Sequence, residues 1–277
     1  MQKIKPKFEH LSQVQRTLQA AQNEVMQKPP ISFAPMQARP LYSIAQEGTL
    51  KNIANEWRAH PEILTKSRAL MVEALRHLNL SDEVVLAAMA RVPRHVFVDE
   101  AFYFRAYDDD ALPIGHQQTI SHPSTVARML SLMRVGAERL GGACHRVLEI
   151  GTGCGYQAAV LSLLAREVYT LERVRSLHEK ARDNLRPFRL ANVHLMFGDG
   201  MLGYPSGAPY SAIIAAAGGD SVPQAWCDQL AVGGRLVAPM AVAGGQQMLL
   251  VIDKSAHGLK QNVLEPVHFV PLKSGIA

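Results

Sequence analysis

The chain has 277 residues, 48% of them hydrophobic, and a formal net charge of +5. This length suffices for one full α/β domain plus an additional segment, and the lack of any apolar run of about 18 residues argues against a membrane span. The three cysteines form no Cys-x-x-Cys pair, which argues against a disulfide framework and against a zinc site. Since the first residues also lack the apolar stretch of a secretory signal, we expect a cytoplasmic protein without a metal.

Residues 1–66 are predicted to be a basic N-terminal extension, partly disordered. They hold 9 Lys and Arg against 5 Asp and Glu. A polar helix is predicted within residues 1–27, and the proline-rich stretch KPPISFAPMQARP that follows opposes both helix and strand. Two roles are open for this charge: a solvated tail, or contact with nucleic acid or another acidic surface.

Helices are expected at the start of the main domain, which we place at residues 67–277. SRALMVEALRHL has apolar residues at helical spacing. NLSDEVVLAAMARVP predicts a second helix that is capped by Ser81 and ended by Pro93. Residues 96–123 are expected to be irregular up to a helix at residues 123–135.

Strands and helices alternate in the remainder of the chain. Apolar segments RVLEIG, EVYTLERV, NVHLMFGDG, YSAIIAAAG and GRLVAPMA are separated mostly by helical ones, GYQAAVLSLLA, SLHEKARDNLRPF and VPQAWCDQL. This alternation predicts an α/β fold with a doubly wound, mostly parallel, Rossmann-like sheet and an N-terminal helical cap. QQMLLVIDKS and EPVHFVPLK are expected to close the chain as two strands, with antiparallel pairing at one edge because no helix separates them.

A glycine turn follows the first of these strands in VLEIGTGCGYQ. Gly151, Gly153 and Gly155 come directly after the strand end at Ile150. Glycines let the backbone take unusual dihedrals and let a ligand approach closely, and the GxGxG spacing differs from that of most dinucleotide sites. We interpret Cys154, inside the turn, as a small filler rather than a nucleophile, because no basic partner is evident.

Acidic residues after the next two strands complete a predicted nucleoside site. Glu172 lies about twenty residues beyond the turn, where a carboxylate can accept both ribose hydroxyls. Asp199, in GDG with Gly200, could accept the exocyclic amine of adenine. No basic residue follows the turn to neutralise a pyrophosphate and Glu149 precedes it, which favours the phosphate-free, positively charged S-adenosylmethionine over NAD. The alternative is that both carboxylates are ordinary strand-end and turn residues.

Seven motifs occur in an order and spacing typical of one enzyme family. They are AMARVPRHVFV (88–98), AYDDDALPIGHQQTIS (106–121), VLEIGTGCGYQAAVL (147–161), VYTLER (168–173), GDG (198–200), GGRLVAP (233–239) and HFVPL (268–272). On these motifs the domain resembles the protein-L-isoaspartate O-methyltransferases, which are class I S-adenosylmethionine-dependent methyltransferases. The resemblance implies methyl transfer to the free α-carboxylate of L-isoaspartyl residues in damaged proteins and peptides, which initiates their repair.

The resemblance also implies a catalytic role for Ser121 of the TIS motif. A carboxylate is already ionised at neutral pH and needs no general base, so the hydroxyl would orient it, with Thr119 and His122 as further substrate-binding candidates. The candidate cofactor-binding residues are Glu149, Gly151, Thr152, Gly153, Gly155, Tyr156, Glu172, Asp199 and Gly200. Several alternatives stay open: Ser121 could merely cap the following helix, and Tyr156 and Gln157 could merely pack. Arg94 and His95 could be surface residues, whereas the resemblance implies that their turn helps to shape the substrate cleft, without a catalytic role.

Four positions depart from the family pattern. The family usually has glycine at Gln117, glutamine at His122, a bulkier ring at Ser124 and aspartate at Ser211. We interpret these as an altered substrate rim. Two alternative functions follow: methylation of a different carboxylate or of RNA on the same scaffold, and a non-catalytic protein with a structural cofactor. The expected partners are isoaspartyl proteins and peptides, without nucleic acid or membrane, and a monomer is expected because such substrates need an open cleft.

Overall fold

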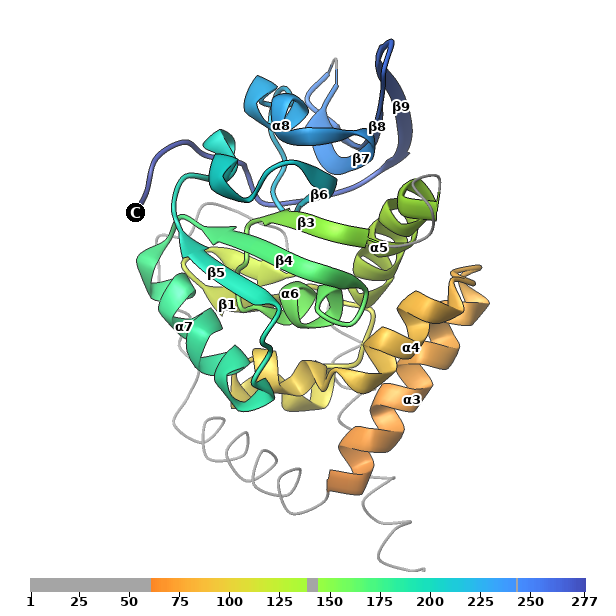
Figure 1. Cartoon of the computed structure of the whole chain (residues 1–277). Coiled ribbons are helices and arrows are strands. Elements are labelled where there is room, and N and C mark those ends of the chain that lie inside the picture. Colours follow the sequence, from red (N-terminus) through yellow and green to blue (C-terminus); the bar gives the residue numbers. More distant parts are fainter. Residues whose placement is uncertain (1–60, 139–143, 243) are drawn as a thin grey trace, which may run out of the picture. The chain divides into compact units, whose positions relative to one another are not determined.

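A seven-stranded sheet forms the centre of the computed structural model, which describes residues 61–138, 144–242 and 244–277 (Figure 1). Its strands are β3 (Cys144–Ile150), β4 (Ala165–Glu172), β5 (Val193–Phe197), β6 (Tyr210–Ala215), β7 (Leu230–Ala241), β8 (Gln247–Ser255) and β9 (Gly258–Pro266). In space they follow the order β5-β4-β3-β6-β7-β8-β9. Pairing is parallel from β5 to β7 and antiparallel for β8 and β9. The predicted α/β fold with an antiparallel edge is therefore confirmed.

Helices connect the parallel strands. They are α6 (Tyr156–Leu161), α7 (Arg175–Leu185) and α8 (Gln224–Gln229), with short 3-10 helices η3 (Arg186–Phe188), η4 (Gly200–Leu202) and η5 (Pro205–Gly207). On α7 the residues spaced four apart, Leu177, Ala181 and Leu185, are buried, as expected for an amphipathic helix on a sheet. Every residue of β6 is buried, which explains why the parallel strands are nearly continuous apolar runs.

Helices also precede the sheet in the chain. They are α3 (Pro61–His77), α4 (Glu83–Arg91), the 3-10 helices η1 (Arg94–Phe97) and η2 (Glu100–Arg105), and α5 (Pro123–Glu138). Helix α5 contacts β6 and β7, while α3 and α4 pack against α5 and each other. The predicted extension lies outside the described residues except for 61–66, which form the first turns of α3. Among the helices that the structure describes, none is both long and apolar enough to cross a membrane.

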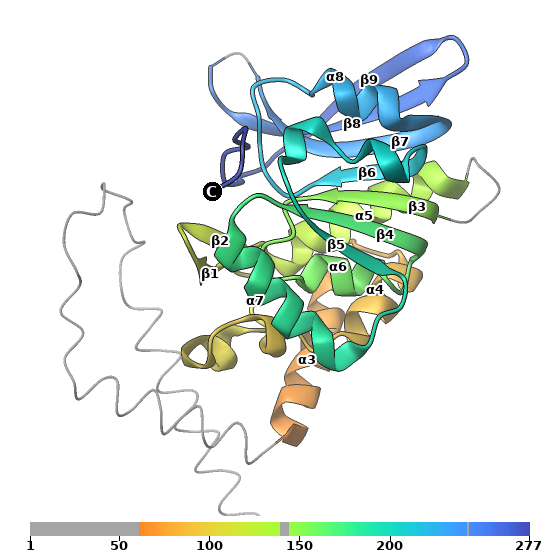
Figure 2. The ribbon, with the colours of Figure 1, turned by 60° about the vertical axis from the view of Figure 1, so that its left-hand side comes forward.

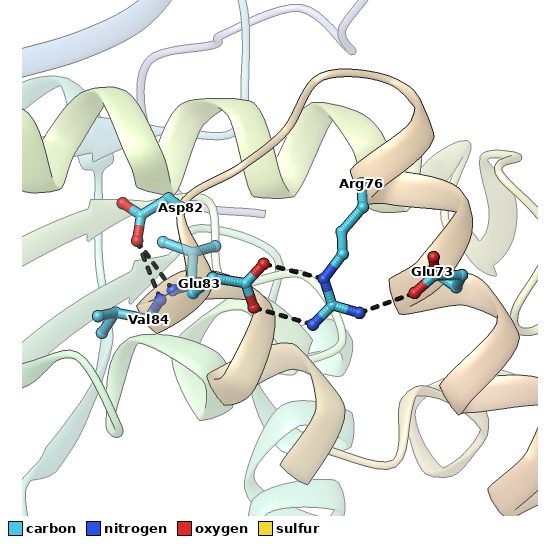
Figure 3. A network of polar contacts seen from close by, with 6 residues as sticks. Glu73, Arg76, Asp82, Glu83 and Val84 are labelled. Atoms are coloured by element: carbon cyan, nitrogen blue, oxygen red, sulfur yellow. Dashed lines mark hydrogen bonds and ion pairs between the residues drawn. The ribbon is translucent and has the colours of Figure 1, made fainter.

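Polar contacts fix α4 against α3 (Figure 3). The Arg76 guanidinium donates to both carboxylate oxygens of Glu83, at 2.9 and 2.8 Å, and to Glu73 at 2.9 Å. Because these side chains are exposed, solvent screens the charges and the pairs set geometry more than stability.

The N-cap of α4 is Asp82. Its carboxylate accepts hydrogen bonds from the amides of Val84 and Val85, both at 3.2 Å, and Arg134 of α5 donates to the same carboxylate at 2.9 Å. The predicted cap at Ser81 is wrong, because the helix begins one residue later and the carboxylate serves both the helix terminus and the arginine.

The last strand also differs from the prediction. β9 covers Gly258–Pro266 and not residues 265–273. The prediction missed it because the strand is largely exposed and lacks the apolar run that marks a buried strand. The apolar HFVPL segment instead docks on Gly218, whose amide donates to the Val270 carbonyl at 2.8 Å and whose carbonyl accepts from Leu272 at 2.7 Å.

A β-hairpin occupies part of the segment that was predicted to be irregular. Strands β1 (Leu112–Gly115) and β2 (Gln118–Ile120) pair antiparallel, and Figure 2 shows them beside α7. The turn residues His116 and Gln117 have φ of 53° and 57°, a left-handed conformation that disfavours residues other than glycine and asparagine. Because histidine and glutamine rarely occupy such a turn, the residues did not indicate a hairpin.

Replacing Gln117 with glycine is expected to raise the free energy of unfolding by about 0.5–1 kcal/mol, because relief of left-handed strain exceeds the added chain entropy. Gln118→Gly, in the adjacent strand position, is the control and is expected to lower it. Urea unfolding of the three proteins measures both changes. Equal destabilisation by the two glycines would show that the turn at Gln117 is unstrained.

Candidate active site

A cavity of about 420 Å³ lies at the carboxyl ends of the parallel strands, where ligands of such sheets bind. One wall is the glycine turn after β3, and another is the end of the β1–β2 hairpin. The lining includes Thr119, Ser121, Gly151, Thr152, Gly153, Tyr156, Gln157, Glu172, Gly200, Ala216, Ala217 and the segment 270–273. Its volume is in the range of about 300–1,000 Å³ that is usual for small-molecule sites.

The glycine turn has the conformation that its sequence predicts. Gly153 and Gly155 have φ of +57° and +93°. A Cβ added at Gly153 would lie 3.1 Å from Ile114 of the hairpin, and one at Gly155 would lie 3.1 Å from Leu185 of α7. Glycine therefore allows both the turn and the close approach of its neighbours.

Glu172 ends β4 and is held by backbone amides. Its Oε2 accepts from the Gly153 amide and its Oε1 from the Val174 amide, each at 2.9 Å. The side chain is 5% exposed and lines the cavity. Since each carboxylate oxygen can accept a second hydrogen bond, the group retains acceptor capacity for a ligand.

Glu149 does not line the cavity, in contrast to its predicted contact with the cofactor. It is fully buried beneath the turn, and its Oε2 accepts from the Thr170 hydroxyl, which also bonds the Thr152 hydroxyl at 2.6 Å. Burial raises the pKa of Glu149 to about 8, so the carboxyl is largely protonated at neutral pH. Desolvation penalises the carboxylate at this position, so a negative charge of Glu149 beside the cofactor's sulfonium stays a prediction.

The raised pKa of Glu149 predicts a pH dependence of stability. Between the ordinary value of 4.5 and about 8, the folded protein keeps a proton that the unfolded chain has lost. Unfolding then releases a proton, so stability falls as the pH rises through this window. Glu149→Gln removes this titrating group, so its free energy of unfolding should depend less on pH. The difference between the two proteins should change by up to roughly 4 kcal/mol between pH 5 and pH 8. Urea unfolding of both proteins at the two pH values measures this; parallel curves would contradict it.

Asp199 also lies outside the cavity lining, although its neighbour Gly200 lines it. The Asp199 Oδ1 accepts from the Met201 amide at 2.8 Å, and its Oδ2 accepts from the Gly275 amide at 2.6 Å. The structure thus shows Asp199 holding the C-terminal segment, whose residue Ala277 reaches the cavity.

Ser121 and Thr119 reach the cavity, whereas His122 does not. The His122 Nε2 lies 3.9 Å from Asp110 Oδ1 instead. At the start of α5 the Ser124 amide donates to Asp109 Oδ1 at 2.8 Å, so Asp109 supplies the side-chain cap that was the alternative role of Ser121.

Only part of the predicted substrate rim lines the cavity. Gln117 lines the cavity, but Ser124 and Ser211 do not. Ser211 is buried at the start of β6, and its hydroxyl donates to the Arg146 carbonyl at 2.8 Å. It therefore lies at the end of the strand away from the cavity, and its departure from the family pattern concerns the sheet.

Three buried residues bear on interpretations left open above. Arg94 is 0% exposed, so its interpretation as a surface residue is wrong. Gln157 lines the cavity, and its side chain lies close enough to Glu149 to lower the pKa of that carboxyl, although no hydrogen bond of 3.5 Å or less joins them. Burial raises the pKa of the Cys154 thiol to about 11, which disfavours the thiolate that a nucleophile requires. In the part of the chain that the structure describes, no cluster of side chains could hold a metal.

Sequence reasoning missed the parts of the cavity that come from distant segments. Ala216 and Ala217 follow β6, and Val270, Pro271 and Leu272 belong to the C-terminal segment. The C-terminal segment contacts Gly218, about fifty residues earlier in the chain. Such a contact leaves no local pattern, so only the HFVPL motif could have indicated that this segment belongs to the site.

Comparisons with known proteins agree with this arrangement. The sequence profile of the family described as "Protein-L-isoaspartate(D-aspartate) O-methyltransferase (PCMT)" matches residues 65–277. A protein-L-isoaspartate O-methyltransferase of Cupriavidus pinatubonensis is 56% identical over 219 residues, covering 76% of this chain and 73% of that protein. One of Leptothrix cholodnii is 59% identical over 211 residues, covering 75% and 74%.

Solved structures give the same result. A protein-L-isoaspartate O-methyltransferase superposes with a TM-score of 0.66 at 28% identity, covering 76% of this chain and 67% of that one. A putative one from Plasmodium falciparum, in complex with S-adenosyl-L-homocysteine, shares the fold with a TM-score of 0.63 at 23% identity, covering 74% and 98%. The chain therefore belongs to the protein-L-isoaspartate O-methyltransferase family.

Proposed function

We propose that this protein transfers a methyl group from S-adenosylmethionine to the free α-carboxylate of L-isoaspartyl residues in damaged proteins and peptides, and so initiates their repair. The observation that carries the proposal is a single cavity with two kinds of wall. The glycine turn and Glu172 form one wall, and Thr119 and Ser121 form another. Membership of the family supports the same reaction.

The cavity residues fit S-adenosylmethionine, which supplies an electrophilic methyl group when bound. Glu172 would accept hydrogen bonds from the ribose hydroxyls. Gly151, Gly153 and Gly200 leave room for close approach. Gln157 lines the same cavity, with its side chain close to the buried Glu149 beneath the turn.

Further cofactor-binding roles follow from position. Thr152 and Tyr156 line the cavity, and Gly155 sets the turn that begins α6. Glu149 would act from beneath the turn by fixing Thr170. Asp199 would act through Gly200 and the C-terminal segment, unless displacement of Gly275 frees its Oδ2 for adenine.

Ser121 would orient the acceptor carboxylate. That group is ionised at neutral pH, since its ordinary pKa is about 4, so it would itself be the nucleophile for the electrophilic methyl group that bound S-adenosylmethionine would supply. The products are a methyl ester and a neutral thioether, and no proton has to be removed. One hydrogen bond from Ser121 and exclusion of water by the cavity walls supply what the reaction needs. Thr119 would bind the peptide beside it, and His122 would meet the peptide outside the cavity.

Methyl transfer to a matched pair of peptides tests this function. The peptides differ only in L-isoaspartate or aspartate at one position, and the cofactor carries a labelled methyl group. We expect label on the isoaspartyl peptide alone, released by mild base as an ester. Label on neither peptide, with the cofactor still bound, would refute the proposed acceptor.

A different carboxylate acceptor is the second candidate. Gln117, at the cavity mouth, places a side chain where the family usually has glycine. If Gln117 excludes isoaspartyl peptides, Gln117→Gly should restore transfer to them. Methylation of RNA through the basic extension would rest on residues outside those described, and transfer to RNA that is lost at high salt would reveal it.

We also infer a cytoplasmic monomer. The three cysteines are free and buried, as suits a reducing compartment, and the open cavity mouth suits a protein substrate. Light scattering of the purified protein and fractionation of cells would test the two inferences separately.

A further inference from the structure

We propose that Arg94 is the residue that positions Ser121 for methyl transfer, by closing the open end of the β1–β2 hairpin. The proposal rests on the role given to Ser121 above. Arg94 lies in η1, far from the glycine turn in sequence and outside the cavity lining. It would therefore act through Ser121 and would not touch the substrate.

The contacts of Arg94 join the two ends of the hairpin. Its Nη2 donates to the Ser121 carbonyl at 2.7 Å and to the Asp110 carbonyl at 3.3 Å. Asp110 lies just before β1, and Ser121 directly follows β2. One nitrogen thus bridges the chain entering and leaving the hairpin, and it fixes the peptide plane next to the Ser121 side chain.

The burial of Arg94 makes a purely stabilising role a poor explanation. The side chain is 0% exposed, yet the hydrogen bonds that the structure gives it go to carbonyl groups and not to a carboxylate. Its Nε and Nη1 have no partner among the described residues. The charge of Asp109 favours the buried guanidinium, but none of the hydrogen bonds of Arg94 goes to a carboxylate. Burial of a cation without such a bond is costly, and buried polar groups without partners call for an explanation such as a role at a functional site.

Arg94 also contacts the cavity wall that contains the glycine turn. Its guanidinium carbon lies 5.0 Å from the ring centroid of Tyr156, a cavity residue at the start of α6. A cation over an aromatic face is attracted to it. The same side chain therefore contacts both Ser121, two residues before α5, and Tyr156, the first residue of α6. It so links the cavity wall formed by Thr119 and Ser121 to the wall formed by the glycine turn.

The other described side-chain contacts around the hairpin do not involve the Ser121 backbone. Asp109 caps the Ser124 amide, and Arg105 pairs with the Asp110 carboxylate. Lys180 of α7 donates to the Ile114 carbonyl at 3.0 Å. Only Arg94, among the side chains that the structure describes, donates to the backbone of Ser121, so its loss should free this residue while the rest of the hairpin stays docked.

A double-mutant cycle with Ser121→Ala tests the proposal. Arg94→Lys keeps the charge but cannot bridge the same two carbonyls with a planar guanidinium. We expect it to lower kcat/KM for the isoaspartyl peptide at least tenfold, as misplacement of a reacting group does. In the double variant the loss should not exceed that of Ser121→Ala alone by more than about twofold, because the two changes act on one contact.

Arg235→Lys is the matched control. Arg235 is also buried, at 5% exposure, and donates to the carboxylate of Asp253 and to the Leu132 carbonyl, away from the cavity lining. Any loss that it causes should multiply with that of Ser121→Ala. Arg94→Gln is the second variant. It removes the buried charge and its desolvation cost, so it should fold even if Arg94→Lys does not, and should show the same lack of additivity.

The outcomes separate this proposal from the proposed function. If the wild type does not methylate the isoaspartyl peptide, or Ser121→Ala is as active as the wild type, the proposed function or the role of Ser121 fails. If both behave as expected but the Arg94 variants keep full kcat/KM, or their losses multiply with that of Ser121→Ala, Arg94 does not position Ser121.

Discussion

Replacing Ser121 with alanine should lower kcat/KM for an isoaspartyl peptide by on the order of 10²-fold, the usual effect of removing one aligned donor from a reacting group. The dissociation constant for S-adenosylmethionine should stay within about twofold, because the glycine turn and Glu172 are untouched. Initial rates with labelled cofactor and a binding titration measure the two quantities separately.

Ser124→Ala is the control for this experiment. Ser124 is three residues away, does not line the cavity, and bonds Asp109 through its backbone amide, so its hydroxyl should be dispensable. Equal activity of Ser121→Ala and Ser124→Ala would show that the Ser121 hydroxyl does not orient the acceptor.

Replacing Glu172 with alanine should weaken binding of S-adenosylhomocysteine by on the order of 10²-fold or more. The variant loses a charged acceptor for two ribose hydroxyls, and each such hydrogen bond contributes about 1.5–3 kcal/mol. It also leaves the Gly153 and Val174 amides without the partner that holds the turn. Glu172→Gln keeps the shape and one acceptor oxygen, and should give an intermediate loss. Isothermal titration calorimetry measures all three proteins.

Glu167 provides the matched control on the same strand. It is partly exposed, pairs with His194 at 2.6 Å, and lies outside the cavity lining. Glu167→Gln should therefore bind S-adenosylhomocysteine as the wild type does. Undiminished binding by Glu172→Ala would mean that the cofactor does not lie against the end of β4.

The sheet could be predicted from the sequence because its signals are local. Strands such as β6 are buried on both faces and read as unbroken apolar runs. Strand β9 was misplaced because it is exposed and carries no such run. The β1–β2 hairpin was missed because His116 and Gln117 hold a left-handed turn without the residues that usually mark one.

The site could be predicted where a single backbone constraint governs it. Gly153 and Glu172 meet because the turn and the end of the neighbouring parallel strand lie at one edge of the sheet. We expected Asp199 in the cavity, but its carboxylate accepts from the Gly275 amide, 76 residues away in the chain. No local pattern indicates so distant a contact. A surface position of Arg94 stayed open because its burial depends on Ser121 and Tyr156, which no local pattern connects to it.

A crystal structure with S-adenosylhomocysteine and an L-isoaspartyl peptide bound together would test the roles of Glu172 and Ser121 at once. We expect the ribose on Glu172, the isoaspartyl α-carboxylate at about 2.7 Å from the Ser121 Oγ, and the sulfur of the cofactor facing that carboxylate. A peptide whose carboxylate lies away from Ser121, or a sulfur turned away from the hairpin wall, would contradict these roles.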